Sequence, residues 1–207
     1  MKLYFSPGAC SLSPHIVLHE AGLAYEPVLT SLQSHKLTDG TDYYGINSKG
    51  YVPLLELDNG ERLSEGPAIV QYIADQVPDK KLAPANGTMA RYRLQEWLNF
   101  ITSELHKGFG VVFNPAMPDE AKTVATARVA TARVAGRLKW VNEQLEGKQY
   151  LMGDTFSVAD AYLFTVTNWS KHVGLDNSAL GNLGAFMARM AARPAVQAAM
   201  KAEGLLK

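Results

Sequence analysis

The sequence predicts an α/β N-terminal domain followed by an all-helical C-terminal domain. The first third of the 207-residue chain alternates short β-type runs with helical periodicity, whereas apolar residues recur at helical spacing almost everywhere after residue 88. Between them, residues 77–88 carry two prolines, a glycine and several charges without any periodicity. We therefore expect domains over residues 1–80 and 88–207, joined by a linker at 81–87.

The N-terminal domain is expected to begin with a strand and a helix. Residues 2–6 (KLYFS) form a short β-type run that ends at a Pro-Gly pair. Apolar residues then recur at helical spacing over residues 11–21, and Pro14 fits there because it falls in the first helical turn. Gly22 is typical of a helix terminator.

The rest of this domain is expected to add three strands and a helix. Residues 25–30 predict a second strand, and the polar stretch 31–50 predicts a loop with at most a helical turn. Residues 52–58 and 61–65 flank Asn-Gly and predict a hairpin. Pro67 then opens a helix. The order β-α-β followed by β-β-α indicates a thioredoxin-like sheet covered by helices on both faces.

The C-terminal domain is expected to contain helices only. Ser157 and Asp160 have the spacing of a capping box at the start of a nearly apolar helix, which we expect to be central to the domain. The predicted helices cover residues 88–113, 119–146, 157–171, 179–192 and 194–202.

Composition narrows the class of protein. Hydrophobic residues make up 47% and charged residues 19% of the chain, and 20 basic side chains balance 20 acidic ones. This predicts a soluble cytoplasmic protein with no nucleic-acid or membrane partner, because there is no basic excess, bilayer-spanning segment or export signal. A single cysteine excludes an internal disulfide, and the five histidines lack metal-ligand spacing, so we expect no metal.

Cys10 is the first candidate for chemistry. It lies between the first strand and the first helix, where unpaired amide hydrogens and the helix dipole favour a thiolate of the protein or of a ligand. Ser11 adds a hydroxyl donor beside it. Ser13 stands where a dithiol motif would have a second cysteine, so disulfide exchange within the chain is excluded. The alternative is that Cys10 is only a small buried apolar residue.

Two short motifs in the hairpin region could bind a peptide. If the Val52-Pro53 bond is cis, the Val52 main chain faces the Cys10 loop and offers both its N–H and its C=O; sequence alone leaves this open. Glu65 could hold an ammonium group, while the Gly66 amide at a helix start could hold a carboxylate. An ordinary helix entrance is the alternative reading of Glu65 and Gly66.

A polar stripe runs along the first helix of the C-terminal domain. Asn99, Ser103 and His106 follow one another at positions i, i+4 and i+7, and Lys107 is adjacent. The stripe is either the solvated side of the helix or a surface that faces the first domain.

Taken together, four segments resemble the glutathione S-transferase family, and most closely its bacterial beta class. They are KLYFSPGACSLSPHI, KGYVPLLELDNGERLSEGPAIVQYIAD, WLNFITSELHKGF and GDTFSVADAYLF. The resemblance implies the glutathione transferase fold, a homodimer, and glutathione as co-substrate between the two domains.

The resemblance also implies roles for individual residues. Cys10 would lie next to the glutathione thiol, with Ser11 beside it. Val52, before a cis Pro53, would pair with the cysteinyl backbone, and Glu65 and Gly66 would hold the γ-glutamyl end. The residues expected from the helical domain are Asn99, Ser103, His106 and Lys107, the last two near the sulfur. Two positions depart from the family pattern: Gly66 replaces a frequent serine, and His35 with Lys36 replaces a lysine that binds the glycyl carboxylate.

Three functions fit these residues. The first is conjugation of the glutathione thiolate to a small hydrophobic electrophile, held in a pocket for which Phe109, Phe113 and Trp169 are candidates, although core packing is an alternative for each. The second is thiol–disulfide exchange or reductive dehalogenation through Cys10. The third is a non-enzymatic carrier of hydrophobic ligands.

Overall fold

A computed structural model describes residues 1–110, 112–113, 118–128 and 133–206, without the side chains of 125–128. It contains two compact units. The first combines Met1–Ala83 with Ala192–Lys207, and the second is Pro84–Ala191. The last helix thus belongs to the first unit, whereas the sequence analysis placed all of residues 88–207 in one helical domain.

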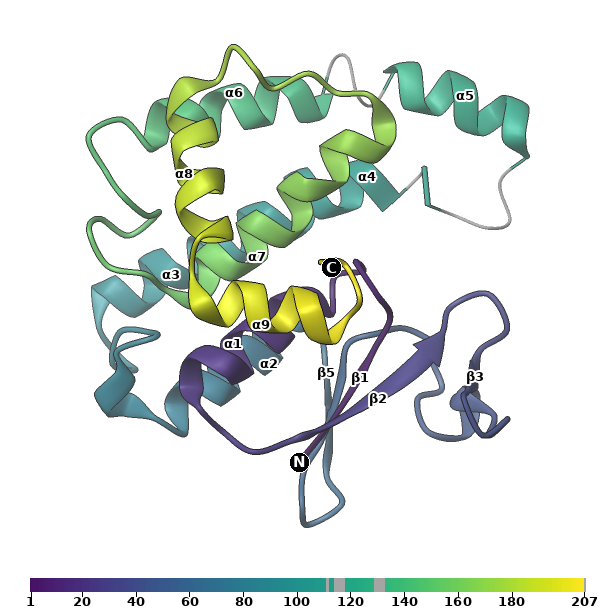
Figure 1. The fold of residues 1–207 in the computed structure, drawn as a ribbon. Coiled ribbons are helices and arrows are strands. Elements are labelled where there is room, and N and C mark those ends of the chain that lie inside the picture. Colours follow the sequence, from purple (N-terminus) through teal and green to yellow (C-terminus); the bar gives the residue numbers. More distant parts are fainter. Residues whose placement is uncertain (111, 114–117, 129–132, 207) are drawn as a thin grey trace. The chain divides into compact units, whose positions relative to one another are not determined.

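The first unit is built on a mixed five-stranded sheet with the strand order β3-β2-β1-β4-β5 (Figure 1). Strands β1 and β2 are parallel, and the other neighbours are antiparallel. The thioredoxin-like fold class is therefore confirmed, and only the short strand β3 was not predicted. The bounds are β1 Lys2–Phe5, β2 Glu26–Ser31, β3 Lys36–Leu37, β4 Leu54–Glu56 and β5 Arg62–Ser64.

The two faces of this sheet are covered differently. Helices α1 (Leu12–Ala21) and α2 (Gly66–Asp75) pack against each other on one face (Figure 1). On the opposite face the buried ring of Tyr4 packs at 5.7 Å from that of Tyr43, which lies in the 3-10 turn η1 (Tyr43–Gly45). Both faces thus carry helical structure, as predicted, but on this face it is a single 3-10 turn within the polar segment 31–50, with Tyr43 as its buried aromatic residue.

Helix α1 has the boundaries that its sequence predicts. It begins at Leu12 with Pro14 in its first turn, and it ends at Gly22, whose φ of 69° is the left-handed conformation that glycine favours. Helix α9 (Pro194–Ala202) lies against α1. Two contacts at its ends join these helices: the ion pair of Arg193 with Glu20 at 2.6 Å, and a buried hydrogen bond between His15 Nδ1 and Glu203 Oε1 at 2.8 Å. These contacts explain why the last helix joins the first unit.

The second unit contains helices joined by loops and turns, and no strand of the sheet lies in its described residues. Helix α7 is buried along nearly its whole length and begins with the predicted capping box of Ser157 and Asp160, so its central position is confirmed. Residues 111 and 129–132 of the predicted helices lie outside the described residues. The bounds are α3 Met89–Phe100, the π-helical turn η3 Ile101–His106, α4 Lys107–Gly110, α5 Asp119–Arg128, α6 Ala135–Gln144, α7 Val158–Asn168, the 3-10 turn η5 Trp169–Val173 and α8 Gly181–Ala191. The first unit also has a 3-10 turn, η2, at Pro78–Lys80.

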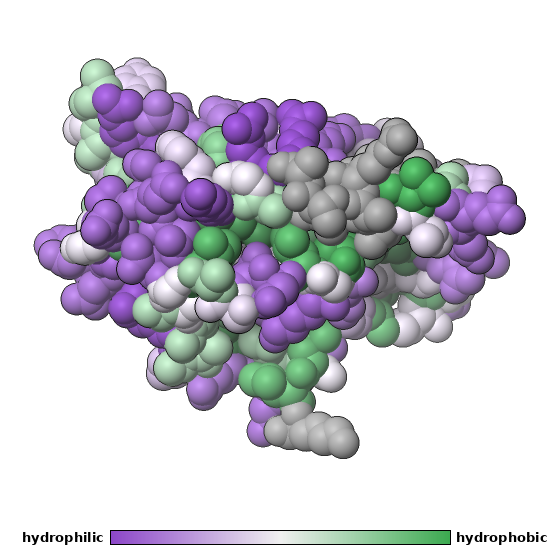
Figure 2. Space-filling model, turned by 90° about the horizontal axis from the view of Figure 1, so that it is seen from above, coloured by the Kyte–Doolittle hydropathy of each residue, from purple (hydrophilic) through white to green (hydrophobic). Residues whose placement is uncertain are grey.

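Hydrophobic side chains remain at the surface of both units. Figure 2 shows apolar residues, in green, among the hydrophilic ones. Tyr51 in the first unit and Tyr92 in the second are more than half exposed. None of the described helices is long and apolar enough to cross a lipid bilayer.

Candidate active site

The loop between β1 and α1 presents Cys10. The loop is closed by the buried hydroxyl of Ser11, which accepts a hydrogen bond from the Ser6 amide at 3.1 Å and donates one to the Ser6 carbonyl at 3.2 Å. Further back, the Gly8 amide donates to the buried carboxylate of Glu203 at 2.9 Å. Both of these hydrogen bonds of Ser11 stay within the loop and stabilise it, and the catalytic role expected from the sequence stays a prediction.

The Cys10 thiol is half-buried and protonated at neutral pH. Its Sγ donates to the Val52 carbonyl at 3.1 Å. Burial raises the pKa of the thiol to about 12, and this outweighs the lowering by the amides of Cys10 and Ser11 at the start of the helix. The carboxylates of Glu65 and Glu203 raise the pKa further. The helix start therefore does not make Cys10 a thiolate, and of the two possibilities that the sequence left open this favours a thiolate of the ligand.

The segment before β4 places the main chain of Val52 next to Cys10. The Val52-Pro53 peptide bond is cis, which settles the question that the sequence left open. The Val52 carbonyl is bound by the Cys10 thiol, while the Val52 amide donates to no acceptor among the residues that the structure describes. The preceding residue is held firmly, because the Tyr51 carbonyl accepts from the Tyr43 hydroxyl at 2.8 Å and from the Asn47 side-chain amide at 2.7 Å.

Glu65 and Gly66 form the turn from β5 into α2. Helix α2 begins at Gly66, so the Gly66 amide is among those without a partner inside the helix. Glu65 has φ 71° and ψ 112°, a conformation that a residue with a side chain rarely adopts and that is found most often at functional sites. A Cβ atom at Gly66 would lie 3.9 Å from Cγ of Pro53, which shows that this turn and the Val52-Pro53 segment are neighbours.

Lys49, which no sequence signal indicated, forms an ion pair with Glu65. Lys49 Nζ lies 2.8 Å from Glu65 Oε1 and 3.1 Å from Ser64 Oγ. Sixteen positions separate Lys49 from Glu65 along the chain. Neither periodicity nor a local motif links them, and only the fold brings them together.

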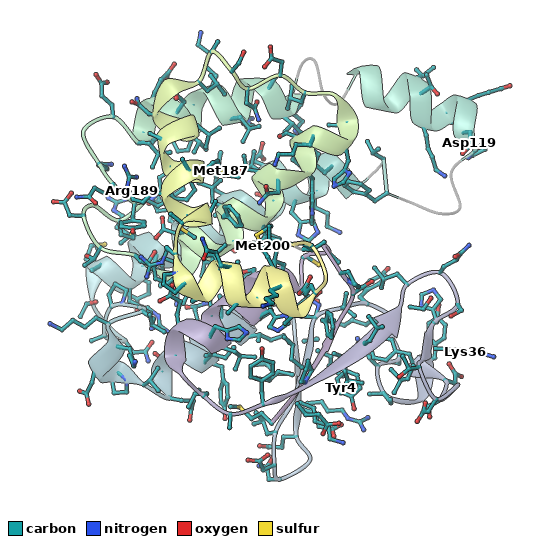
Figure 3. The ribbon with its side chains drawn as sticks, viewed as in Figure 1. Tyr4, Lys36, Asp119, Met187, Arg189 and Met200 are labelled. Atoms are coloured by element: carbon teal, nitrogen blue, oxygen red, sulfur yellow. The ribbon has the colours of Figure 1, made fainter. Side chains whose placement is uncertain are left out.

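His35 and Lys36 occupy different surroundings. His35 Nδ1 lies 3.2 Å from the Gly50 carbonyl, and its ring is 4.6 Å from that of Tyr44. This places His35 against the segment that leads to Val52. Lys36 is exposed on the edge strand β3, where its side chain extends outward (Figure 3). The geometry thus favours His35 over Lys36 as a neighbour of the Val52 segment.

The remaining predicted residues lie in the second unit. Asn99, Ser103 and Lys107 are exposed, and Ser103 donates its hydroxyl to the Asn99 carbonyl at 3.0 Å. The predicted α-helical stripe is interrupted, because residues 101–106 form the wider π-helical turn η3 and His106 is its last residue. π-Helical turns often occur at functional sites.

His106 is held by a buried tyrosine that the sequence analysis did not single out. His106 Nδ1 lies 2.6 Å from the hydroxyl of Tyr162 on α7. The ring of Trp169 also packs edge to face against the His106 ring, with the two ring centres 4.9 Å apart. Tyr162 is 56 positions from His106 along the chain, so no sequence spacing could have connected them.

The three aromatic residues proposed for an electrophile pocket differ in burial. Phe109 is fully buried and Trp169 is nearly so, and their rings are 5.9 Å apart, which fits core packing. Phe113 is 46% exposed, and its ring lies 5.5 Å from that of Trp169. Phe113 is therefore the one of the three with surface available for a ligand.

Comparison with known proteins agrees with this fold. Residues 8–76 match the family described as "Glutathione S-transferase, N-terminal domain", and residues 104–194 match "Glutathione S-transferase, C-terminal domain". Over 205 residues the chain is 46% identical to the glutathione S-transferase GstA of Escherichia coli O157:H7, covering 99% of this chain and 100% of that protein.

Solved structures give the same result. The bacterial beta class glutathione S-transferase of Sphingomonas chungbukensis is 50% identical with a TM-score of 0.93, and both chains are covered completely. A sphingomonad glutathione S-transferase complexed with glutathione is 48% identical with a TM-score of 0.90, again over 100% of both chains. The chain belongs to the glutathione S-transferase family of transferase enzymes. Within that family it is a member of the bacterial beta class.

Proposed function

We propose that this enzyme joins the thiolate of glutathione to an electrophilic carbon of a small hydrophobic substrate, and that the Val52 main chain and Cys10 hold the reacting sulfur. The observation that carries the proposal is the hydrogen-bonding state of Val52. Its carbonyl is bound by the Cys10 thiol at 3.1 Å, and its amide has no acceptor among the described residues. A peptide backbone offers the matching donor and acceptor.

Glutathione would exchange partners at Val52. Its cysteinyl N–H would donate to the Val52 carbonyl, and its cysteinyl C=O would accept from the Val52 amide. The exchange would release the Cys10 S–H, which could then donate to the sulfur of glutathione. A thiol whose pKa is about 12 keeps its proton, so it can stabilise a neighbouring thiolate without competing as a nucleophile.

The other predicted residues would complete the site. Glu65 and the Gly66 amide would hold the γ-glutamyl end, and His35, rather than Lys36, would approach the glycyl carboxylate. From the helical unit, Asn99, Ser103, His106 and Lys107 would contact glutathione, and Phe113 would contact the electrophile. With a chlorinated aromatic substrate the carbon–sulfur bond forms, the carbon–chlorine bond breaks, chloride leaves, and the thiol proton of glutathione passes to solvent.

Steady-state kinetics with a chlorinated aromatic compound tests the proposal. The Cys10→Ala variant should keep conjugation within about tenfold of the unmodified enzyme, since it loses one hydrogen-bond donor and no nucleophile. Failure to turn over any of several classes of electrophile would refute conjugation. Loss of all turnover in Cys10→Ala would instead assign the reaction to the protein sulfur.

The redox alternative is tested by the same variant. Thiol–disulfide exchange or reductive dehalogenation through Cys10 needs a thiolate, and burial raises the pKa of this thiol, which disfavours the thiolate.

A carrier function would give tight dye binding without turnover. A homodimer and a cytoplasmic location also belong to this proposal, and light scattering of the purified protein would test the dimer.

A further inference from the structure

We propose that Lys49 determines specificity for the γ-glutamyl end of glutathione by binding its α-carboxylate while Glu65 binds the neighbouring α-ammonium. This inference rests on the proposed function and adds to it a residue that the family resemblance did not supply. It depends on three features of the first unit: an exposed ion pair, two rigid backbone segments, and the absence of a hydroxyl at Gly66.

The ion pair is well formed but exposed. Lys49 Nζ lies 2.8 Å from Glu65 Oε1, and the two side chains are 48% and 67% exposed. Exposed pairs of this kind contribute little to stability. Either partner can therefore turn toward a charged ligand at small cost, and Lys49 Nζ already has a second contact with Ser64 Oγ at 3.1 Å.

The backbone at both residues is held independently of the ion pair. The Lys49 amide donates to Asn47 Oδ1 at 3.2 Å, and the Gly50 amide donates to the Asn47 carbonyl at 2.8 Å. Asn47 is buried, so this turn is anchored in the protein. Glu65 is held in its left-handed conformation at the start of α2. The backbone positions from which the two charged side chains extend are thus held, which limits the region that the charges must search around a ligand.

The chemistry of the ligand matches this arrangement. The γ-glutamyl group ends in a free amino acid, with an ammonium and a carboxylate on the same carbon. Glu65 alone would satisfy only the ammonium. Because Gly66 has no hydroxyl, it can offer the carboxylate one neutral amide, and Lys49 is the cation paired with Glu65 at this position. Binding would exchange one protein ion pair for two pairs with the ligand.

Calorimetric titration with glutathione and two analogues tests the proposal. One analogue lacks the α-carboxylate (γ-aminobutyryl-Cys-Gly) and the other lacks the α-ammonium (glutaryl-Cys-Gly). Lys49→Gln should weaken glutathione binding by about tenfold, the scale of one charge-assisted hydrogen bond. It should leave binding of the carboxylate-free analogue unchanged. Lys49→Arg should restore most of the affinity, and Lys80→Gln, which changes an exposed lysine in η2, should have no effect.

The outcomes distinguish a wrong role for Lys49 from a wrong proposed function. Equal weakening for glutathione and the carboxylate-free analogue would overturn the role of Lys49, because the effect would then not depend on the carboxylate. Tighter binding by Lys49→Gln would also overturn it, showing that Lys49 competes with the ammonium for Glu65. If the unmodified protein binds no glutathione at all, the proposed function fails and this proposal fails with it.

Discussion

The thiol of Cys10 donates its hydrogen to the carbonyl of Val52 across 3.1 Å. This contact ties the start of the first helix to the main chain that pairs with a peptide in the proposed function. It also defines the state of the only cysteine in the chain: a protonated donor rather than a thiolate. The nucleophile in the proposed reaction is therefore the sulfur of glutathione.

The reactivity of Cys10 toward iodoacetamide should be low and should rise with pH without a plateau. Burial raises the pKa of this thiol to about 12. The thiolate fraction, and with it the alkylation rate, should increase about tenfold per pH unit from about pH 7 to about pH 10. Mass spectrometry of the single modified site measures the rate. A plateau below about pH 9 would show an acidic thiol and contradict this description.

The same pKa predicts a loss of stability at alkaline pH. The pKa in the folded protein, about 12, is above the value of 9.0 for an unperturbed thiol, so the folded state keeps a proton that the unfolded chain releases. The contribution is fully present below about pH 9 and is lost as the pH rises toward about 12, by about 1.4 kcal/mol per unit. Urea unfolding of the unmodified protein and of Cys10→Ala should diverge over this range. Parallel curves would contradict the prediction.

Gly66 should accept a side chain, and Gly50 should not. A Cβ atom at Gly66 makes an ordinary contact of 3.9 Å with Pro53, so Gly66→Ala should raise the free energy of unfolding by about 0.5–1 kcal/mol. Gly66→Ser should also lower KM for glutathione several-fold, since its hydroxyl can donate to the γ-glutamyl carboxylate. At Gly50, with φ 67°, a Cβ atom would lie 2.6 Å from the Tyr44 ring, so Gly50→Ala should destabilise the protein. A raised KM in both Gly66 variants would mean that a side chain blocks the site.

Tyr162 should act on the reaction through His106. Tyr162→Phe removes the partner at 2.6 Å from His106 Nδ1 and should lower kcat/KM for conjugation several-fold. Combined with His106→Gln, it should add little, because the two residues act as a unit. Tyr92→Phe changes an exposed tyrosine on α3 and serves as the control. Additive losses in the double variant would assign Tyr162 a purely structural role.

Asp160 should be among the most important residues for stability. Its buried carboxylate accepts from the Ser157 amide at 2.7 Å, the Ser157 hydroxyl at 2.8 Å and the Leu151 amide at 2.8 Å. Asp160→Ala should cost about 3–5 kcal/mol, since it leaves two buried amides without this acceptor. Asp176→Ala, which removes an exposed acceptor of the Ser178 amide, should cost much less. Similar thermal shifts for the two variants would contradict this difference.

Local sequence signals predicted the parts of the fold that depend on local physics. Gly22 ends α1, Asn59-Gly60 turns between β4 and β5, and Ser157 with Asp160 caps α7, because each signal acts within a few residues. Local signals did not predict the π-helical turn at residues 101–106 or the addition of α9 to the first unit. Both depend on contacts between distant segments, such as that of Glu203 with His15.

The candidate site was predictable to a similar extent. The segments around Cys10, Val52 and Glu65 have local signals, and the structure brings Cys10 and Val52 into contact. Lys49 and Tyr162 gave no signal, because an exposed lysine and a tyrosine in an apolar helix are common features. The protonation state of Cys10 was left open by the sequence, because a position at a helix start is visible there, whereas the burial that outweighs it is not.

The most direct test uses the Cys10→Ala variant, which contains no protein thiol. Any thiolate absorbance in the ultraviolet difference spectrum of its complex with glutathione then belongs to glutathione alone. We predict a thiolate band at near-neutral pH, well below the pKa of 9.0 of an unperturbed thiol, together with continued conjugation of a chlorinated aromatic compound. A bound glutathione that forms a thiolate only at the pH of the free thiol, in a variant that no longer conjugates, would contradict it.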